Sequence, residues 1–317
     1  MMEEAIKNFP KQFEWEPTIE NSKFEIRNSK FLIVGMGGSH LAGDLIKTWN
    51  PSFGLIVWAD YGLPAEVLAR AGPPPLVIAN SYSGNTEETL DAFNEALKKN
   101  LPLAAISIGG KLLELAKKNN VPYIQMPDTG IQPRSALGFN VRALLKLMGE
   151  DEALEATSQL ASLLKPEELK DAGQQLAEKL KGFIPIIYSS NRNLAIAYNW
   201  KIKFNETGKV PAFYNVFSEL NHNEMTGFGD VGKNFQFIFL RDSEDHLRVQ
   251  KRMAVTQKIL EDRGFNVNNF DLNEEHKWYR IFKSLVIADW TAYHTALLYG
   301  HEPEQVPVIE EFKKLIV

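Results

Sequence analysis

The chain has 317 residues, 44% of them apolar and 24% charged, which is ordinary for a globular protein long enough to form two domains. A formal net charge of −5 argues against a broad nucleic-acid-binding surface, and the absence of cysteine excludes disulfides, thiol nucleophiles and cysteine metal ligands. No apolar stretch reaches the roughly 18 residues of a membrane span, and the acidic start "MMEEAIKNFPKQFEWEP" is unlike a signal peptide. We therefore expect a soluble, cytoplasmic protein that binds neither nucleic acid nor membrane.

From residue 30 onward, short apolar runs alternate with amphipathic segments. Strands are expected at 31–35, 55–60, 76–81, 103–107 and 123–126, and helices near 39–49, 64–71, 86–100 and 110–119. Continuous apolar strands separated by amphipathic helices predict a parallel sheet that is covered on both faces. A largely helical stretch, 135–182, follows and is expected to link two halves of the chain.

The alternation then starts again. Strands are expected at 184–189, 213–217, 235–240 and 267–272, with helices near 193–206, 247–263 and 277–299 and a final helix in "PVIEEFKKLIV". We predict an α/β fold of two doubly wound subdomains, each a parallel sheet flanked by helices, with a cleft between them. The first would span 1–150 with an N-terminal helical extension, and the second 151–317 with the C-terminal helix. Because ligands of such sheets bind beyond the carboxyl ends of strands, the strand-to-helix loops are the expected ligand-binding segments.

The first such loop, "IVGMGGSHLAG", contains three closely spaced glycines. Gly35 and Gly37 fit the dinucleotide-binding pattern G-x-G-x-x-G, but His40 stands at its third position, so nicotinamide binding is disfavoured. A tight turn at Gly37, Gly38 and Ser39 would suit a small anion or a sugar hydroxyl, because glycine lets backbone N–H groups approach a ligand. The loop alone is equally compatible with a turn that only packs a helix on its sheet.

The loop after the third strand, "NSYSGNTEET", places the hydroxyls of Ser81, Ser83 and Thr86 around a single glycine. A well-capped helix is one explanation, since Asn85 and Glu88 have the spacing of a capping box. A cap needs only one short polar side chain, however, and three hydroxyls at a helix N-terminus can hold a phosphate without a cation. The sequence favours phosphate binding, with the following acids, Glu87 and Glu88, directed away from the ligand.

These two loops, in this order, resemble the sugar isomerase (SIS) superfamily, whose Ser/Thr-rich loop binds the phosphate of phosphosugars. Further segments narrow the resemblance to the bifunctional phosphoglucose/phosphomannose isomerases. They are "NFPKQ", "GMGGS", "DYGLP", "PRSALG", "FNETGKVPAF" and "ELNHNEMTGF". The resemblance spans nearly the whole chain. It implies a metal-independent, cofactor-free aldose–ketose isomerase of carbohydrate metabolism that interconverts glucose 6-phosphate, and mannose 6-phosphate, with fructose 6-phosphate through a cis-enediol.

The resemblance also assigns roles to four residues. Glu206, in "FNETG", matches the catalytic base, although its position alone suggests only a surface glutamate at a helix end. His222, in "ELNHNEMTG", matches a histidine that assists ring opening and reaches the site from the neighbouring subunit, which implies a homodimer. Arg134, in "PRSALG", matches the arginine that stabilises the enediolate, and Lys313 matches a lysine that helps ring opening, with Lys314 as the alternative.

Two other functions remain open from the sequence. One is a non-catalytic phosphosugar sensor, and the other is a SIS isomerase for a different sugar phosphate. The lack of cysteine disfavours a glutamine-hydrolysing amino-sugar synthase. No metal site is expected, because the spacing of the histidines builds none.

Overall fold

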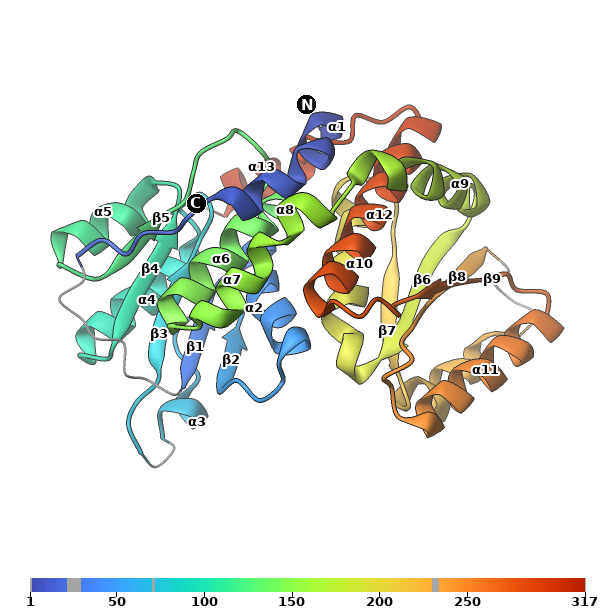
Figure 1. The fold of residues 1–317 in the computed structure, drawn as a ribbon, viewed down its shortest axis with the longest axis horizontal. Helices are drawn as coiled ribbons and strands as arrows, with labels where there is room; N and C mark the ends of the chain where they lie inside the picture. Colours follow the sequence, from blue (N-terminus) through green and yellow to red (C-terminus); the bar gives the residue numbers. More distant parts are fainter. Residues whose placement is uncertain (1, 22–29, 70–71, 230–233, 317) are drawn as a thin grey trace. The chain divides into compact units, whose positions relative to one another are not determined.

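The computed structural model describes residues 2–21, 30–69, 72–229 and 234–316 (Figure 1). The chain forms two compact units, an N-terminal unit of Asn8–Leu164 and a C-terminal unit of Lys165–Val317 with Met1–Lys7. Each unit contains its own all-parallel sheet flanked by helices, so the predicted α/β fold class is confirmed. None of the helices in the described ranges is long and apolar enough to cross a membrane.

The N-terminal unit is built on a five-stranded sheet of order β2-β1-β3-β4-β5. Its strands are β1 (Phe31–Val34), β2 (Leu55–Trp58), β3 (Leu76–Asn80), β4 (Leu103–Ser107) and β5 (Tyr123–Gln125). Its helices are η1 (Phe9–Glu14), α2 (Gly38–Trp49), α3 (Ala65–Leu68), α4 (Glu87–Lys98), α5 (Gly110–Lys118), η2 (Pro133–Ser135), α6 (Leu137–Met148), α7 (Asp151–Ser158) and α8 (Leu160–Leu163). The helix expected at 64–71 is shorter than predicted, and residues 70–71 lie outside the described ranges.

Helices cover both faces of this sheet, as its continuous apolar strands predict. On one face, Leu32, Val77 and Ala105 join a core with the buried side chains of α4 and α5. On the other face α2 packs so closely that a Cβ on Gly43 would lie 2.8 Å from Ile33 Cδ1. Helices α7 and α8 contact α6 and η1, so the division of the chain by contacts falls after residue 164, whereas the sequence analysis put the boundary at 150/151.

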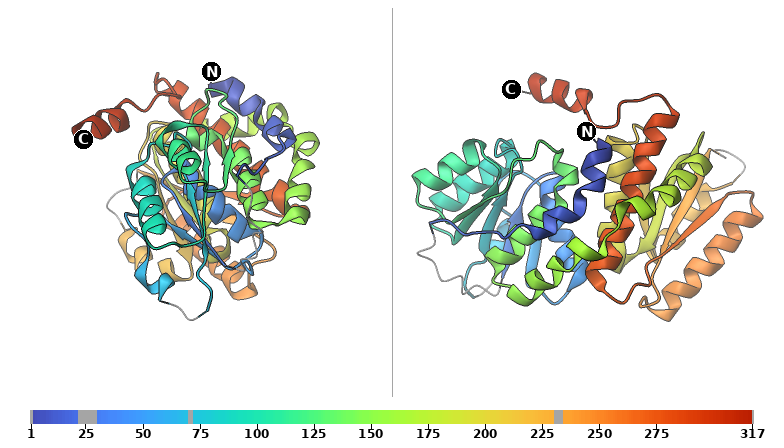
Figure 2. Two further views of the ribbon diagram at one scale, coloured as in Figure 1. Left: turned by 90° about the vertical axis from the view of Figure 1, so that its left-hand side faces the viewer. Right: turned by 45° about the horizontal axis from the view of Figure 1, so that its top comes forward.

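The C-terminal unit is built on a four-stranded sheet of order β7-β6-β8-β9. Its strands are β6 (Ile184–Ser190), β7 (Phe213–Phe217), β8 (Phe235–Arg241) and β9 (Val267–Asp271). Its helices are α1 (Met2–Lys7), η3 (Pro166–Leu169), α9 (Lys170–Leu180), η4 (Asn191–Asn193), α10 (Leu194–Glu206), η5 (Glu219–His222), η6 (Glu224–Gly227), α11 (Leu247–Asp262), α12 (Lys277–Leu298) and α13 (Pro307–Leu315). Figure 2 shows α13 at the end of an extended segment after α12, and α13 buries none of its residues.

Aromatic side chains fill the core on one face of this second sheet. Phe228 meets Phe237 edge to face, with ring centroids 5.0 Å apart, and Tyr188 lies 5.4 Å from Phe237. On the opposite side α10 packs against α12, where the indole N–H of Trp200 donates to Ser284 Oγ at 2.9 Å. The loop that carries residues 218–228 is therefore anchored through Leu220 and Phe228, which are both buried in the first of these clusters.

The short N-terminal helix α1 belongs to the C-terminal unit because Glu3 ties it to α9 and α12. Glu3 accepts hydrogen bonds from Lys170 Nζ at 2.7 Å and from the hydroxyl of Tyr293 at 3.3 Å. The hydrogen bond from Lys170, followed by that from Lys7, lowers the pKa of Glu3 to about 2. A carboxyl group whose pKa is lowered by folding stabilises the folded state above its unfolded pKa, and this contribution is lost as pH falls toward the folded pKa.

We expect Glu3→Gln to lower the thermal unfolding midpoint at pH 7 by roughly 2–4 °C, since a partly exposed ion pair contributes about 1 kcal/mol at most. The difference from the unchanged protein should persist down to about pH 4.5 and shrink as pH falls further toward 2. Thermal melts recorded by circular dichroism across this range measure it. A difference that stayed constant below pH 4.5 would contradict the assignment to the Glu3 carboxylate.

Candidate active site

The glycine loop between β1 and α2 lies against two other segments of the N-terminal unit. A Cβ on Gly35 would lie 2.6 Å from the carbonyl oxygen of Asn80, at the end of β3. A Cβ on Gly38 would lie 2.8 Å from the carbonyl group of Pro133 and 3.0 Å from Arg134 N. Only glycine allows these approaches. The loop therefore has a packing role, and a ligand-binding role for Gly37 and Gly38 remains a prediction.

Ser39 joins the glycine loop to the hydroxyl loop, Ser81–Thr86. It is buried, its hydroxyl oxygen accepts a hydrogen bond from Tyr82 N at 3.0 Å, and its carbonyl oxygen accepts one from Asn80 Nδ2 at 2.7 Å. The loops after β1 and β3 are adjacent because these strands are neighbours in the sheet. Asn80 is a residue that the sequence analysis did not select. The sequence does mark Asn80, because it is the only polar residue in the otherwise apolar strand β3.

The hydroxyl loop is a compact turn around Gly84, which has a φ of 72°. Ser81 is fully buried; its Oγ lies 2.8 Å from Thr86 Oγ1 and accepts from Gly84 N at 3.1 Å. Ser83 is exposed, and its Oγ accepts from Asn85 N at 3.3 Å. The structure thus brings Ser81 and Thr86 together and points to a preformed loop, with the Ser83 hydroxyl at its surface.

The explanation of this loop as a capping box for α4 does not hold. Thr86 occupies the N-cap position of α4, and no side chain there caps the helix. The Asn85 side chain instead accepts from Lys111 N at 3.1 Å, so it caps the neighbouring helix α5. The first N–H groups of α4 and the positive end of its dipole are therefore not used by a capping side chain.

The two acids in the first turn of α4 face a neighbouring phenol. Glu87 is exposed and Glu88 is half-buried. Desolvation, followed by the negative charges of Glu88 and Glu87, raises the pKa of Tyr61. The carboxylates therefore lie near Tyr61 in the loop between β2 and α3, and their direction away from a ligand stays a prediction.

Arg134 lies in η2 and is 2% exposed. Its backbone N–H is next to Gly38, so the structure brings the glycine loop, the hydroxyl loop and Arg134 into one region of the N-terminal unit. A buried guanidinium keeps its positive charge in water-poor surroundings, where it acts strongly on nearby negative charge.

The other three predicted residues are in the C-terminal unit, on three separate elements. Glu206 is the last residue of α10, and the helix end is held by Lys209, whose Nζ donates to the carbonyl oxygens of Glu206, at 2.6 Å, and of Gln305. His222 ends η5 and is exposed, while the neighbouring Asn221 is fixed by a hydrogen bond to Thr256 Oγ1 at 2.8 Å.

Lys313 lies on α13, where its side chain is 61% exposed. Its Nζ pairs with Glu310 Oε1 of the same helix at 2.8 Å. Lys314 is also exposed. The choice between the two lysines as the ring-opening residue therefore stays a prediction.

The strand ends of the second sheet differ in chemistry from those of the first. β6 and β8 are neighbours, as β1 and β3 are, but buried Asp242 occupies the end of β8, where it accepts from Asn193 Nδ2 at 3.0 Å and from Arg280 Nη1 at 3.3 Å. Hydrogen bonds from Arg192, followed by those from Arg280, lower the pKa of Glu244 to about 2. Paired charges thus fill the position that glycines and hydroxyls occupy in the first sheet.

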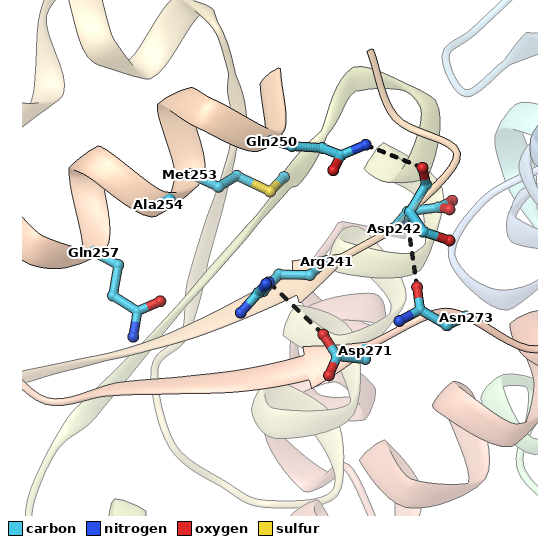
Figure 3. A pocket seen from close by; sticks show the side chains of 9 residues that line it. Arg241, Asp242, Gln250, Met253, Ala254, Gln257, Asp271 and Asn273 are labelled. Atoms are coloured by element: carbon cyan, nitrogen blue, oxygen red, sulfur yellow. Dashed lines mark hydrogen bonds and ion pairs between the residues drawn. The ribbon is translucent and has the colours of Figure 1, made fainter. Parts of the chain in front are cut away.

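A cavity of about 110 Å³ lies where β8 and β9 end beside α11 (Figure 3). Its rim is polar: Arg241 Nε lies 3.7 Å from Asp271 Oδ1, and Gln250 Nε2 donates to the Ser243 carbonyl at 3.0 Å. None of the sequence-predicted site residues lines this cavity. Within the described ranges, no group of three or more His, Asp or Glu side chains is arranged to hold a metal ion.

Gly84 permits a contact that the hydroxyl loop depends on. A Cβ at this position would lie 1.9 Å from the carbonyl oxygen of Gly109, whereas a Cβ on Gly130, whose φ of 71° is nearly the same, would meet nothing within 4 Å. We expect Gly130→Ala to cost about 1 kcal/mol for its left-handed backbone. Gly84→Ala should cost about 1–3 kcal/mol more, because the loop must move. Urea unfolding of both variants measures the difference, and equal losses would refute the contact as a constraint.

Comparison with known proteins identifies the family. The profile of the bacterial phospho-glucose isomerase C-terminal SIS domain matches residues 169–316. A bifunctional phosphoglucose/phosphomannose isomerase of Aquifex aeolicus is 36% identical over 98% of this chain and 96% of its own length. A D-glucosamine-6-phosphate 4-epimerase of Sulfolobus acidocaldarius is 30% identical over 66% of this chain and 67% of its own length.

Solved structures with a similar fold include the tagatose-6-phosphate ketose/aldose isomerase of Escherichia coli. It has a TM-score of 0.72 and 17% identity, and the match covers 95% of this chain and 94% of that one. At this identity the likeness supports the fold alone. The sequence relationship over nearly the full length is the stronger finding, and by it the chain belongs to the family of bifunctional phosphoglucose/phosphomannose isomerases.

Proposed function

We propose that this protein, an isomerase by its family, interconverts glucose 6-phosphate and mannose 6-phosphate with fructose 6-phosphate through a cis-enediol. The observation that carries the proposal is the hydroxyl loop at the N-terminus of α4. The N-cap side chain does not cap this helix, and the nearby Asn85 caps α5 instead. A helix start of this kind, with Ser and Thr hydroxyls beside it, is a ready site for a phosphate group. Family membership supplies the reaction.

The phosphate is assigned to Ser81, Ser83 and Thr86, with Gly37, Gly38 and Ser39 near the sugar. Hydroxyl and backbone N–H donors hold a dianion without neutralising it. Ser81 and Thr86 are already hydrogen-bonded to each other, so little ordering is needed on binding. Because the phosphate lies far from C1 and C2 in a hexose, its binding energy serves to orient the reacting end.

At the reacting end, Glu206 removes the proton from C2 of the open-chain aldose and returns it to C1. The proton on O2 moves to O1, so that the aldehyde becomes a primary alcohol and C2 becomes a ketone. Arg134 stabilises the negative charge that develops on these two oxygens, as a fixed cation in a buried setting can. His222 and Lys313 are assigned to ring opening, which transfers a proton between the ring oxygen and O1.

We also propose a homodimer in which His222 reaches the site of the partner subunit, and a cytoplasmic location. The exposure of His222 supports the first proposal, since an imidazole at the surface of one subunit is accessible to another. The anchoring of its neighbours Leu220 and Asn221 would hold the ring in a defined position.

Glu206→Gln should lower kcat by at least about 10³-fold while changing phosphosugar affinity less than about 3-fold, because the amide cannot accept the C2 proton. A coupled assay of fructose 6-phosphate turnover and calorimetric binding of fructose 6-phosphate measure the two quantities. Glu261→Gln, in the last turn of α11, is the matched control and should leave both unchanged. Turnover within 10-fold of the unchanged protein would remove Glu206 from the role of base.

Mixing two inactive variants tests the exchange of His222. If His222 acts across a twofold dimer, a refolded equimolar mixture of Glu206→Gln and His222→Ala should regain about a quarter of full activity, from the one intact site of each mixed dimer. Each variant refolded alone should stay inactive. No recovery in mixtures shown to contain mixed dimers would place His222 in the site of its own subunit.

The relative named as an epimerase gives a specific reason to consider another sugar phosphate. The same assay therefore uses a panel of glucose 6-phosphate, mannose 6-phosphate, glucosamine 6-phosphate and arabinose 5-phosphate. Turnover of glucosamine 6-phosphate or arabinose 5-phosphate, without the two hexose phosphates, would replace the proposed substrates. Tight binding with no turnover of any of the four would identify a phosphosugar sensor.

A further inference from the structure

The segment "NFPKQ" has no part in the chemistry described above, yet it ends in a buried amide. Gln12 lies in η1, where Pro10 helps to begin the helical turn, and only 4% of Gln12 is exposed. A buried amide is stable only when its donors and acceptor are satisfied. The partners of Gln12 therefore indicate what the segment does.

Among the residues that the structure describes, the hydrogen bonds of the Gln12 side chain all go to the turn that follows Arg134. Its Nε2 donates to the carbonyl oxygen of Ser135 at 2.7 Å. Its Oε1 accepts from Gly138 N at 2.9 Å and from Phe139 N at 3.3 Å. These two N–H groups belong to the first turn of α6, whose own N-cap residue, Ala136, provides no side-chain cap. Gln12 thus supplies this cap from a distant part of the chain.

Gly138 shows how closely the segments are packed. A Cβ on Gly138 would lie 2.8 Å from Gln12 Cβ and 3.2 Å from Phe13 Cζ. Any larger residue would push η1 away from the turn. Glycine at position 138 therefore lets η1 and the start of α6 approach closely enough for the Gln12 amide to form its hydrogen bonds.

The backbone of Arg134 is consequently held on both sides. On one side, Pro133 and Arg134 N lie against Gly38 of the glycine loop. On the other side, Gln12 binds the carbonyl group of the next residue, Ser135, and the start of the helix beyond it. A long arginine side chain amplifies any rotation of its own backbone, so these two contacts limit where the guanidinium can lie.

We propose that Gln12 is a positioning residue that orients Arg134 toward the reacting oxygens; this rests on the role of Arg134 in the proposed function. In this proposal Gln12 has no contact with the substrate or the reacting atoms. Its effect passes through the η2 turn, and a displacement of about 1 Å at a charge-stabilising group can lower a rate by about 10²-fold. No hydrogen bond between described residues joins Gln12 to the hydroxyl loop, so phosphate binding should not depend on Gln12.

Gln12→Leu removes all three hydrogen bonds at similar volume. We expect kcat for fructose 6-phosphate to fall by about 10- to 100-fold while inhibition by inorganic phosphate changes less than about 2-fold. Affinity for arabinonate 5-phosphate, a five-carbon mimic of the enediolate, should fall by about 10-fold or more. Gln12→Glu has nearly the same shape and retains the acceptor Oε1 for Gly138 N and Phe139 N, so it provides a second variant if Gln12→Leu is too unstable. It loses the donor to the Ser135 carbonyl and should show the same pattern more weakly.

A purely structural role is distinguished by a control and by a double-mutant cycle. Thr157→Val removes a different buried hydrogen bond of the N-terminal unit, from Arg142 Nη1, and none of those of Gln12, so it should reduce stability without changing kcat at 25 °C. In an Arg134→Ala background, Gln12→Leu should reduce kcat by less than about 3-fold, because its effect passes through the missing guanidinium.

The outcomes of these experiments separate the positioning role of Gln12 from the proposed function of the protein. Equal factors in both backgrounds, or weakened binding of inorganic phosphate by Gln12→Leu, would overturn the positioning role. Absence of turnover in the unchanged protein, or full turnover in Arg134→Ala, would instead refute the proposed function or the assignment of Arg134. If Gln12→Leu bound arabinonate 5-phosphate as tightly as the unchanged protein does, the positioning role would be overturned, whatever the turnover.

Discussion

Two hydrogen bonds at Ser39 hold together the strand-end loops on which the candidate site is built. The hydroxyl oxygen accepts from Tyr82 N, and the carbonyl oxygen accepts from the side chain of Asn80, so the loop after β1 cannot move independently of the loop after β3. Parallel pairing puts both strand ends at one edge of the sheet, and glycine at positions 35 and 38 permits the close approach. The conformation of the hydroxyl loop, and through Gly38 the position of Arg134, follow from this arrangement.

The two sheets share a topology but differ in what their strand ends carry. In the first sheet the ends of β1 and β3 carry glycines and hydroxyls, which leave backbone N–H groups accessible to a ligand. In the second, the end of β8 carries Asp242 and Glu244, each bound by arginine side chains of the same unit. Acids and arginines that satisfy one another offer little to an outside anion. The second unit instead contributes Glu206 and His222 under the proposed mechanism, from the end of α10 and from η5.

Under the proposed function, neutral donors hold the phosphate, and the cationic Arg134 acts at the other end of the substrate. A phosphate held by neutral donors requires no cation, so the mechanism assigns Arg134 to the enediolate, where charge develops only in the reaction. Arg134 is buried, where its charge is weakly screened, so a change in its distance from the reacting oxygens alters the interaction energy more than it would in water. The contacts of Gly38 and Gln12 with the turn around Arg134 hold its backbone from two sides.

Sequence patterns alone determined the order and type of the elements, because strand and helix periods are local and their ends are marked by local residues. The apolar runs became parallel strands within one or two residues of the expected ends, and α10 ended at Glu206, two residues before Gly208. Only the tertiary structure decided which groups pair across the chain. Asn85 has the spacing to cap α4 but caps α5, through Lys111, 26 residues away, and Gln12 caps α6 from more than 120 residues away. Such pairings depend on how sheets and helices pack, and no local pattern records them.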